Sequence, residues 1–203
     1  IPNPIDVNIC HPVSQEQARG MLGLPSKTKL LLFGALNVTD KRKGIDYLVE
    51  ALKKLGNTEC ELVVMGQVKE DIQNLFSMPM HAMGYLTDDF KIAALYNAVD
   101  VFVTSSLEEN LPNMIMESLS CGTPCVGFRI GGIPEMIDHK QNGYLANYKD
   151  ADDLAAGIQW VLDYPDKETL SKACVEKVKR CYSEEVVAGQ YKALYEKLLD
   201  NAK

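Results

Sequence analysis

The sequence has little of what several common classes of protein require. Acidic residues outnumber basic ones by 28 to 21, for a formal net charge of −7, which argues against a nucleic-acid-binding surface, because such surfaces need clustered positive charge. No apolar run approaches the roughly 18 residues of a membrane-spanning helix. The opening IPNPIDVNIC lacks the basic region and apolar core of a signal peptide. The chain also contains no internal repeat, low-complexity tract or linker.

Patterns typical of disulfides and metal sites are missing as well. The six cysteines are scattered, at positions 10, 60, 121, 125, 174 and 181, and no two of them form a C-x-x-C pair. Several lie in apolar runs, so reduced thiols in the core of a cytosolic protein are favoured over disulfides. The three histidines have no triad-like setting, and we assign them no catalytic role.

What is present predicts an α/β fold. Apolar runs of strand length occur at Lys29–Leu36, Cys60–Met65, Val101–Thr104 and Pro124–Phe128, with brief strands expected at Met80–Met83 and Asn142–Ala146. We expect helices at Ser14–Leu24, Ile45–Leu55, Lys69–Phe76, from Asp88 or Asp89 to Val99, from Asp150 to Leu162, and at Lys167–Cys181 and Ser183–Ala202. This alternation is typical of a doubly wound parallel sheet. With 203 residues and 46% hydrophobic content, the chain can form one large domain.

Two strand-to-helix turns lie within the stretch from Val101 to Glu135. The first strand gives way to the polar loop SSLEEN, after which Pro112 is suited to be the first residue of a helix. Leu111 is then the capping residue, and it has no side-chain oxygen for the unpaired N–H groups of the first turn. A second strand leads to Gly131-Gly132 and another helix start; this glycine pair suits either close contact of the backbone with a ligand or a tight turn that closes the second strand–helix unit. Parallel sheets bind ligands where such turns open, and an uncapped helix start favours an anion.

Three cations, Lys41, Arg42 and Lys43, precede Gly44 and the helix expected from Ile45. Cations at the positive end of a helix dipole cost roughly a few tenths of a kcal/mol each, which a bound anion would relieve. The alternative is a solvated turn whose charges point into water.

A further pattern carries a resemblance to a known family. Glu109 and Glu117 are separated by seven residues, and CGTPCVGF, GGIPEMI and NGYLA follow in that order. This set resembles the E-x7-E signature of retaining glycosyltransferases with the GT-B fold, in particular the group-four family (GT4), which builds polysaccharides, lipopolysaccharide and other glycoconjugates. The resemblance covers nearly all of residues 1–202 and implies a Rossmann-like domain.

The resemblance also bears on how the domains are organised. The opening PNPID is similar to the segment with which these transferases enter their second domain. We therefore interpret residues 1–203 as the nucleotide-sugar (donor) binding half. We expect the natural protein to continue upstream into an acceptor-binding N-terminal domain that is absent from this chain.

The resemblance implies a site for the donor diphosphate. Lys43-Gly44 matches the lysine–glycine pair that contacts the diphosphate in the family, and the backbone N–H groups of Met114 and Ile115 match positions that hold the donor phosphate. Many members have an arginine after the glycine at the end of the first strand, where this chain has Gly34-Ala35. One diphosphate contact is therefore left open, with Lys41 or Arg42 as its substitute.

The two acidic residues of the signature imply different roles. By resemblance, Glu117 accepts hydrogen bonds from the ribose hydroxyls of the donor; a carboxylate among apolar neighbours needs a partner, unless it reaches solvent. Glu109 lies beside the donor sugar and is the catalytic candidate, because it would stabilise positive charge developing at the anomeric carbon. Glu108 competes with it, and only the spacing to Glu117 favours Glu109. For both, the alternative is a surface loop acid.

Two positions bear on the base and the sugar. The segment Gly84-Tyr85-Leu86 resembles the one whose backbone meets the edge of the base in the family, and Leu86 is the residue we assign to this contact. The alternative is that the apolar pair Tyr85-Leu86 belongs to the ordinary core. Many members read E-G-F-G where this chain reads ENLP. Pro112 has no N–H to donate to the sugar, and the side chain of Asn110 offers a contact in its place.

We therefore expect the full-length protein to transfer a hexosyl unit from a UDP- or GDP-sugar to an acceptor hydroxyl, with retention of configuration. The family's usual independence of a divalent ion implies that no metal or other cofactor is needed. The acceptor would be a glycan or a lipid-linked molecule, bound through the N-terminal domain. The expected location is cytoplasmic, with the inner face of a membrane, reached by peripheral association, as the alternative.

This fragment alone should bind nucleotide and transfer sugar poorly or not at all. The helix expected at Ser183–Ala202 would lie near the domain junction and lack some of its apolar partners here. Two other functions stay open: a non-catalytic nucleotide-binding or scaffold module, and a UDP-sugar epimerase-like GT-B enzyme.

Overall fold

The computed structural model describes residues 1–38, 40–56, 59–67 and 72–201. Its centre is a parallel sheet of six strands in the order β3-β2-β1-β4-β5-β6. The strands are β1 (Lys29–Asn37), β2 (Cys60–Gln67), β3 (Met80–Gly84), β4 (Val101–Thr104), β5 (Cys125–Phe128) and β6 (Gly143–Ala146). All five pairings are parallel, so that Leu31 lies opposite Leu62 on one side and Val101 on the other. The predicted doubly wound α/β fold is confirmed.

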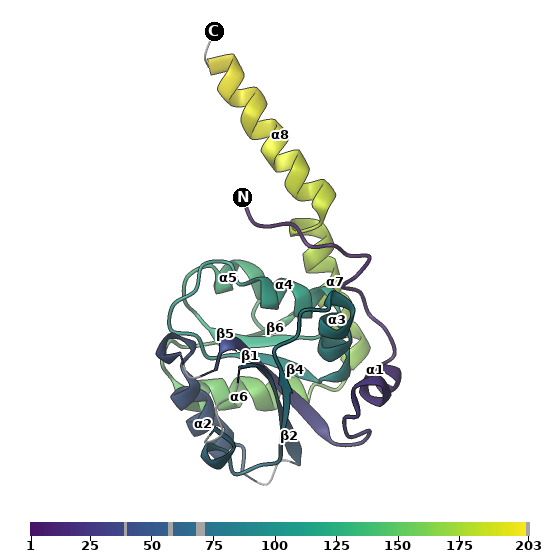
Figure 1. Cartoon of the computed structure of the whole chain (residues 1–203). Coiled ribbons are helices and arrows are strands. Elements are labelled where there is room, and N and C mark those ends of the chain that lie inside the picture. The colour runs from purple at the N-terminus through teal and green to yellow at the C-terminus, as the bar shows by residue number, and fades with distance from the viewer. Residues whose placement is uncertain (39, 57–58, 68–71, 202–203) are drawn as a thin grey trace.

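Helices cover both faces of the sheet (Figure 1). They are α1 (Gln15–Leu22), α2 (Ile45–Lys54), α3 (Asp89–Ala98), α4 (Asn113–Ser120), α5 (Ile133–Met136), α6 (Ala151–Leu162), α7 (Lys167–Cys181) and α8 (Glu184–Asn201), with 3-10 turns η1 (Lys41–Lys43) and η2 (Ile72–Leu75). Helices α2 and α6 pack together on one face, and α1, α3, α4 and α7 cover the other. The strands are buried from both sides, which explains their continuous apolar runs.

Most helices begin where their capping residues predict. The side chains of Ser14, Asp88 and Asp150 accept hydrogen bonds from backbone N–H groups in the first turns of α1, α3 and α6. The exception is α4, whose N-cap is Pro112 rather than the predicted Leu111. Pro112 has extended backbone angles (φ −68°, ψ 119°), so the helix starts one residue later. The capping residue still has no side-chain oxygen to offer.

Other boundaries differ from the predictions. The helix predicted at Lys69–Phe76 falls partly outside the described residues, and the part within them is the 3-10 turn η2. The helix predicted after Gly131-Gly132 is only four residues long, and its cap Gly132 offers no side chain. The strand predicted from Asn142 begins at Gly143.

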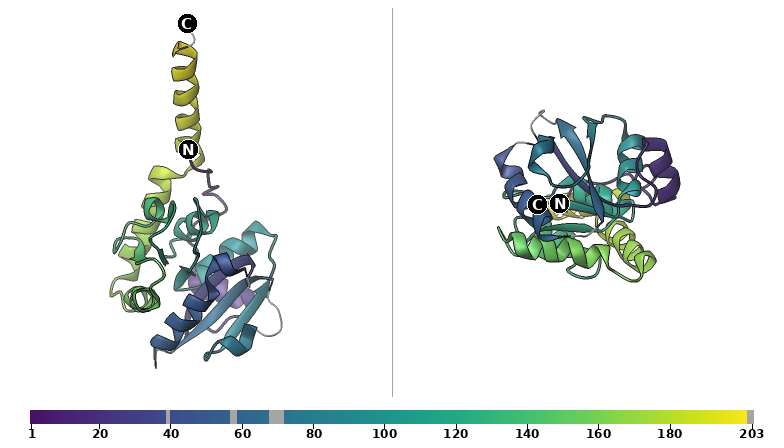
Figure 2. Two further views of the ribbon diagram at one scale, coloured as in Figure 1. Left: turned by 90° about the vertical axis from the view of Figure 1, so that its left-hand side faces the viewer. Right: turned by 90° about the horizontal axis from the view of Figure 1, so that it is seen from below.

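Helix α8 runs away from the body of the domain (Figure 1, Figure 2). Val187 at its start is buried, whereas Tyr191, Leu194 and Leu198 are 41%, 42% and 56% exposed, as predicted for a helix that lacks apolar partners. The N-terminal segment lies beside the start of this helix, where the N–H of Ile5 donates to the carbonyl of Tyr182. Among the described residues, no helix is long and apolar enough to cross a membrane.

A largely buried ion pair joins segments at the amino edge of the sheet, where the strands begin. Arg19, on α1, donates to the carboxylate of Asp100 at 2.9 Å and to four backbone carbonyls, at Pro25, Ser26, Thr28 and Ala98. The same Asp100 oxygen accepts the N–H of Leu30, at the start of β1. One guanidinium thus holds α1, the end of α3 and the first residues of β1 and β4 together.

We predict that Arg19→Met lowers the free energy of unfolding by about 3–5 kcal/mol, because it leaves the Asp100 carboxylate without its charged partner. Urea denaturation at neutral pH measures the loss. The control is Lys172→Met, which removes the Lys172–Glu168 pair, whose side chains are 67% and 79% exposed. That variant should change stability by no more than about 0.5 kcal/mol. An Arg19→Met variant as stable as this control contradicts the role of the pair.

Candidate functional site

The strand order reverses between β1 and β4. From β1 the chain builds outward through β2 and β3 on one side, and through β4, β5 and β6 on the other. Parallel sheets of this kind bind ligands outside the carboxyl ends of the strands at the point of reversal. Two segments meet there: the turn at residues 41–44 after β1, and the loop at residues 105–112 between β4 and α4.

Lys43 and Glu109 form an ion pair across this reversal point. Their side chains are 30% and 15% exposed, and the Glu109 carboxylate also accepts the hydroxyl of Ser106 at 3.0 Å. A charge-assisted contact of this kind, partly screened from water, holds both side chains in place. The structure therefore brings two of the predicted site residues together.

Backbone contacts hold both segments. The hydroxyl of Ser105 donates to the carbonyl of Lys43 at 2.9 Å, and the N–H of Leu107 donates to the carbonyl of Arg42 at 2.7 Å. A Cβ atom at Gly44 would lie 2.0 Å from the carbonyl oxygen of Ser105, and this glycine has φ +62°. Only glycine allows the turn to approach the loop this closely.

The Gly131-Gly132 turn supports the loop from the other side. A Cβ atom at Gly131, where φ is +53°, would lie 1.8 Å from the carbonyl oxygen of Glu109. The N–H of Gly132 donates to the carbonyl of Asn110 at 2.7 Å. These glycines fit against the backbone that carries Glu109, whereas the sequence left both a ligand contact and a tight turn open for them.

The start of α4 points toward the same edge without a side-chain cap. One of its two predicted phosphate donors is engaged, since the N–H of Ile115 donates to the carbonyl of Pro112 at 3.0 Å. The first turn of α4 thus closes on its own capping residue, and the phosphate-binding role of Met114 and Ile115 stays a prediction. The Met114 side chain covers Gly34, where a Cβ atom would lie 2.1 Å from its methyl carbon.

Glu117 lies one turn further along α4 and has a buried partner. The hydroxyl of Tyr96, on α3, donates to its carboxylate at 2.9 Å. Burial raises the pKa of Glu117 above its ordinary value, and the hydrogen bond from Tyr96 partly offsets that rise. The partner required by a carboxylate among apolar residues is therefore a phenol that the sequence did not single out.

A cavity of about 150 Å³ opens between Glu117 and the ends of β1, β2 and β3. It is lined by Ala35, Leu36, Met65, Gly66, Tyr85, Leu86, Ile92, Met114 and Glu117. Among the described residues that line it, Glu117 alone carries a charge. A second cavity of about 200 Å³, lined by Ile5, Asp6, Ile9, Cys10, Asp89, Ile92 and Glu117, lies on the other side of this carboxylate. The first cavity is apolar with one polar anchor, a composition typical of small-molecule sites.

The remaining predicted site residues lie on the surface around this site. The side chain of Asn110 is exposed. Arg42 is paired with Asp40 at 2.7 Å, while Lys41 is exposed. Of the two residues that could replace the family's arginine, which is missing at Ala35, Arg42 is therefore already engaged by a carboxylate. Among the described residues, no cluster of three or more histidine, cysteine or acidic side chains could hold a metal ion.

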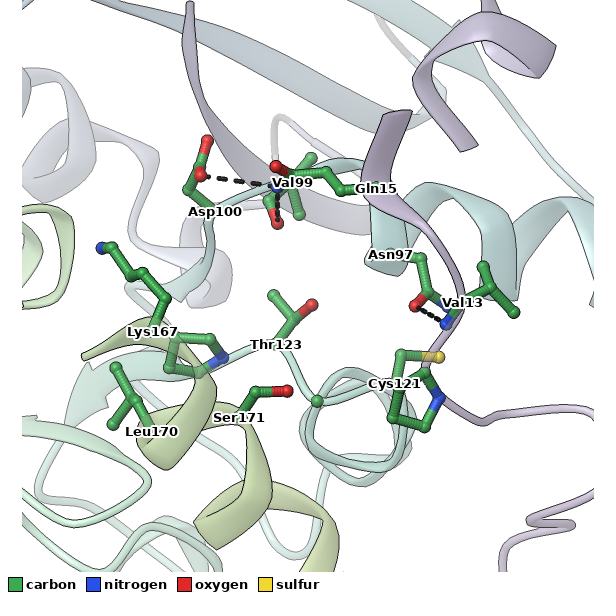
Figure 3. Close-up of a pocket in the computed structure, with 13 residues that line it drawn as sticks. Val13, Gln15, Asn97, Val99, Asp100, Cys121, Thr123, Lys167, Leu170 and Ser171 are labelled. Atoms are coloured by element: carbon green, nitrogen blue, oxygen red, sulfur yellow. Dashed lines mark hydrogen bonds between the residues drawn. The ribbon is translucent and has the colours of Figure 1, made fainter. Parts of the chain in front are cut away.

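Another pocket, of about 200 Å³, lies at the amino edge of the sheet and is separate from this site (Figure 3). Its polar side chains are largely engaged in the fold. Gln15 donates to the carbonyl of Val99, Asn97 accepts the N–H of Val13, and Lys167 donates to two carbonyls at the end of α6.

The chain belongs to the family described as glycosyl transferases group 1, whose model matches residues 27–164. It is 31% identical over 163 residues to the sulfoquinovosyl transferase SQD2 of Arabidopsis thaliana, covering 78% of this chain and 31% of that protein. The resemblance to glycosyltransferases found in the sequence is thereby confirmed at the level of the family.

Solved structures agree on the fold. Sucrose-phosphate synthase from Thermosynechococcus elongatus superposes with a TM-score of 0.84 at 28% identity, over 99% of this chain and 52% of that one. Anabaena HepE, solved in complex with UDP-glucose, superposes with a TM-score of 0.80 at 19% identity, over 97% of this chain and 57% of that one. The chain therefore spans about a third to a little over half of the length of these relatives.

We predict that Gly131→Ala destabilises the protein by at least about 1–2 kcal/mol, because alanine disfavours a positive φ and its Cβ atom would overlap the Glu109 carbonyl. Thermal unfolding measures the effect. The matched control is Gly20→Ala on α1, where a Cβ atom meets nothing within 4 Å and alanine should stabilise the helix by about 0.5–1 kcal/mol. Equal stability of the two variants would mean that the Glu109 loop does not depend on the close approach at Gly131.

Proposed function

We propose that this chain is the donor-binding domain of a retaining glycosyltransferase of the GT4 type. The full-length enzyme transfers a hexosyl unit from a UDP- or GDP-sugar to an acceptor hydroxyl in polysaccharide or glycoconjugate biosynthesis. The observation that carries this proposal is the grouping, at one reversal point, of the Lys43–Glu109 pair, the uncapped start of α4 and the cavity that ends at Glu117. No metal or other cofactor takes part.

The nucleoside occupies the apolar cavity. Its ribose hydroxyls donate to the Glu117 carboxylate, and the base lies between Met65 and the Tyr85-Leu86 backbone. The complex of HepE with UDP-glucose supports a nucleotide-sugar ligand for this fold. The diphosphate then lies over the start of α4, where the N–H of Met114 and the positive end of the helix dipole favour an anion.

The diphosphate changes the partner of Lys43. In the structure this ammonium neutralises Glu109; a nucleotide diphosphate carries more negative charge than one carboxylate and attracts the lysine more strongly. Glu109 then turns to the donor sugar, where it binds hydroxyls and stabilises the positive charge that develops as the bond from the anomeric carbon to the diphosphate breaks. Lys43 and the start of α4 stabilise the departing diphosphate.

The acceptor is bound by an N-terminal domain outside this chain. The exposed apolar residues of α8 support this arrangement, because a helix with Tyr191, Leu194 and Leu198 open to water has an unburied stripe along one side. The chain by itself binds nucleotide and transfers sugar poorly. We place the full-length protein in the cytoplasm, with peripheral association at the inner face of a membrane as a second arrangement.

We predict that UDP affinity depends on the ionised form of Glu117. Since burial raises the pKa of this carboxyl, it takes up a proton at a higher pH than an ordinary glutamate, and UDP affinity falls as the pH is lowered through that value. Calorimetric titration with UDP and with GDP across a pH series measures the dependence and identifies the preferred base.

Glu117→Gln is the control for this dependence, since it keeps the shape of the side chain and removes its titration. This variant should weaken UDP binding by about tenfold at neutral pH and lose the Glu117 step from the pH profile. Binding of neither UDP nor GDP by the unaltered chain would instead favour a non-catalytic scaffold.

We predict that substituting Lys43 weakens UDP binding, whereas substituting its partner Glu109 does not. Lys43→Ala removes a cation from the diphosphate and should weaken UDP binding by about tenfold or more. Glu109→Gln releases Lys43 from its competing partner and should leave UDP affinity unchanged or higher. In the full-length protein, the same variant should reduce turnover by roughly a hundredfold. Equal losses of affinity and turnover in Glu109→Gln argue against its catalytic role.

A further inference from the structure

A cluster of aromatic rings lies along the outer side of α6, away from the donor site. Trp160, the single tryptophan of the chain, has its ring centroid 5.0 Å from that of Tyr164 and 6.1 Å from that of Tyr144. His139 continues the row, 4.5 Å from Tyr144. Both Trp160 and Tyr164 are partly buried against the core beneath them, which fixes the orientation of their rings.

Of these rings, Trp160 and Tyr164 border a shallow pocket of about 430 Å³. We call it the α6 platform; it is lined by Ala156, Gln159, Trp160, Asp163, Tyr164 and Pro165. Among the described residues, no side-chain nitrogen or oxygen is both buried and without a hydrogen-bond partner. The indole N–H of Trp160 donates to none of those residues, so it is not fully buried and is available to a ligand.

The platform also carries an acceptor with a fixed position. The Asp163 carboxylate accepts the side-chain amide of Gln159 at 2.5 Å and the ammonium of Lys29 at 3.3 Å. The hydrogen bond from Gln159 keeps the pKa of Asp163 below its ordinary value, so the group is ionised at neutral pH. Two aromatic rings, an N–H donor, an amide and a carboxylate therefore surround one shallow pocket.

The α6 platform lies at the amino edge of the sheet, opposite the donor site. The Lys29–Asp163 contact fixes this position, because Lys29 is the first residue of β1, whereas Lys43 and Glu109 follow the carboxyl ends of β1 and β4. A molecule on the platform does not compete with a nucleotide sugar.

We propose that the α6 platform binds a neutral oligosaccharide chain. A sugar ring presents an apolar face of C–H groups, which stacks on an aromatic ring, and a rim of hydroxyls that both donate and accept hydrogen bonds. The platform offers the matching groups: the Trp160 and Tyr164 rings for the face, and the indole N–H and the Asp163 carboxylate for the rim. In a member of a glycosyl transferase family, such a site would hold a glycan at a distance from the reaction.

Other ligand classes fit the platform less well. A phosphate or an anionic lipid headgroup needs cations, and the nearby Lys29 is already neutralised by Asp163. An ionised carboxylate in the pocket repels such anions. A neutral, hydroxyl-rich ligand avoids this repulsion and uses the carboxylate as an acceptor.

The single tryptophan makes the test direct. We would titrate the chain with maltohexaose, cellohexaose, laminarihexaose and mannohexaose, exciting only tryptophan and following its emission. At least one of these oligosaccharides should cause a saturable change, with a dissociation constant on the order of millimolar, as expected for a shallow, open site. Saturating UDP should leave this binding unchanged.

Asp163→Ala should weaken the oligosaccharide binding by about tenfold, because it removes the charged acceptor; Asp163 is exposed, so the fold should be retained. The matched control is Asp152→Ala, an exposed acid on the same helix with a single contact to Lys54 outside the platform. The proposal is overturned if no oligosaccharide gives a saturable change, if both variants lose binding equally, or if UDP competes. UDP titration of the same samples tests the donor site separately.

Discussion

The loop between β4 and α4 has no regular secondary structure, yet it carries Glu109 to the reversal point of the sheet. It is held in place because two turns from neighbouring strands press against its backbone. On one side, Gly44 approaches the carbonyl of Ser105, and on the other, Gly131 approaches the carbonyl of Glu109, at distances that leave no room for a Cβ atom. This steric requirement, together with the backbone hydrogen bonds at Leu107 and Gly132, gives an irregular loop the defined position that the catalytic role proposed for Glu109 requires.

The two carboxylates of the signature occupy different electrostatic environments. Glu109 is paired with a cation and a hydroxyl, so its charge is neutralised where a diphosphate would compete for Lys43. Glu117 is held by the phenol of Tyr96 in an apolar setting that raises its pKa. One side chain can exchange its partner when an anion arrives, and the other presents a fixed acceptor. This contrast suits the two roles that we propose for them, at the sugar and at the ribose.

The two edges of the sheet differ in the contacts that they carry. At the amino edge, Arg19 and Asp100 join four backbone segments through a buried ion pair, and the α6 platform lies outside this network. At the carboxyl edge, charged and apolar groups stand open around cavities. The Arg19–Asp100 contacts that hold the strand starts together are therefore separate from the groups around the candidate donor site.

Periodicity and turn chemistry were enough to predict the succession of strands and helices along the chain. Apolar runs of strand length alternate with amphipathic segments, and local capping residues mark several helix starts. The spacing of Glu109 and Glu117, with the segments after them, indicated the family. The sequence alone could not reveal the pairing of Lys43 with Glu109, the support of Glu117 by Tyr96 or the engaged amide of Ile115. These contacts join groups on separate elements, or depend on how the first turn of α4 closes, so packing of the whole chain decided them. The same holds for Gly131: its sequence pattern allowed either a tight turn or a ligand contact, and only the neighbouring Glu109 backbone shows why a side chain cannot fit there.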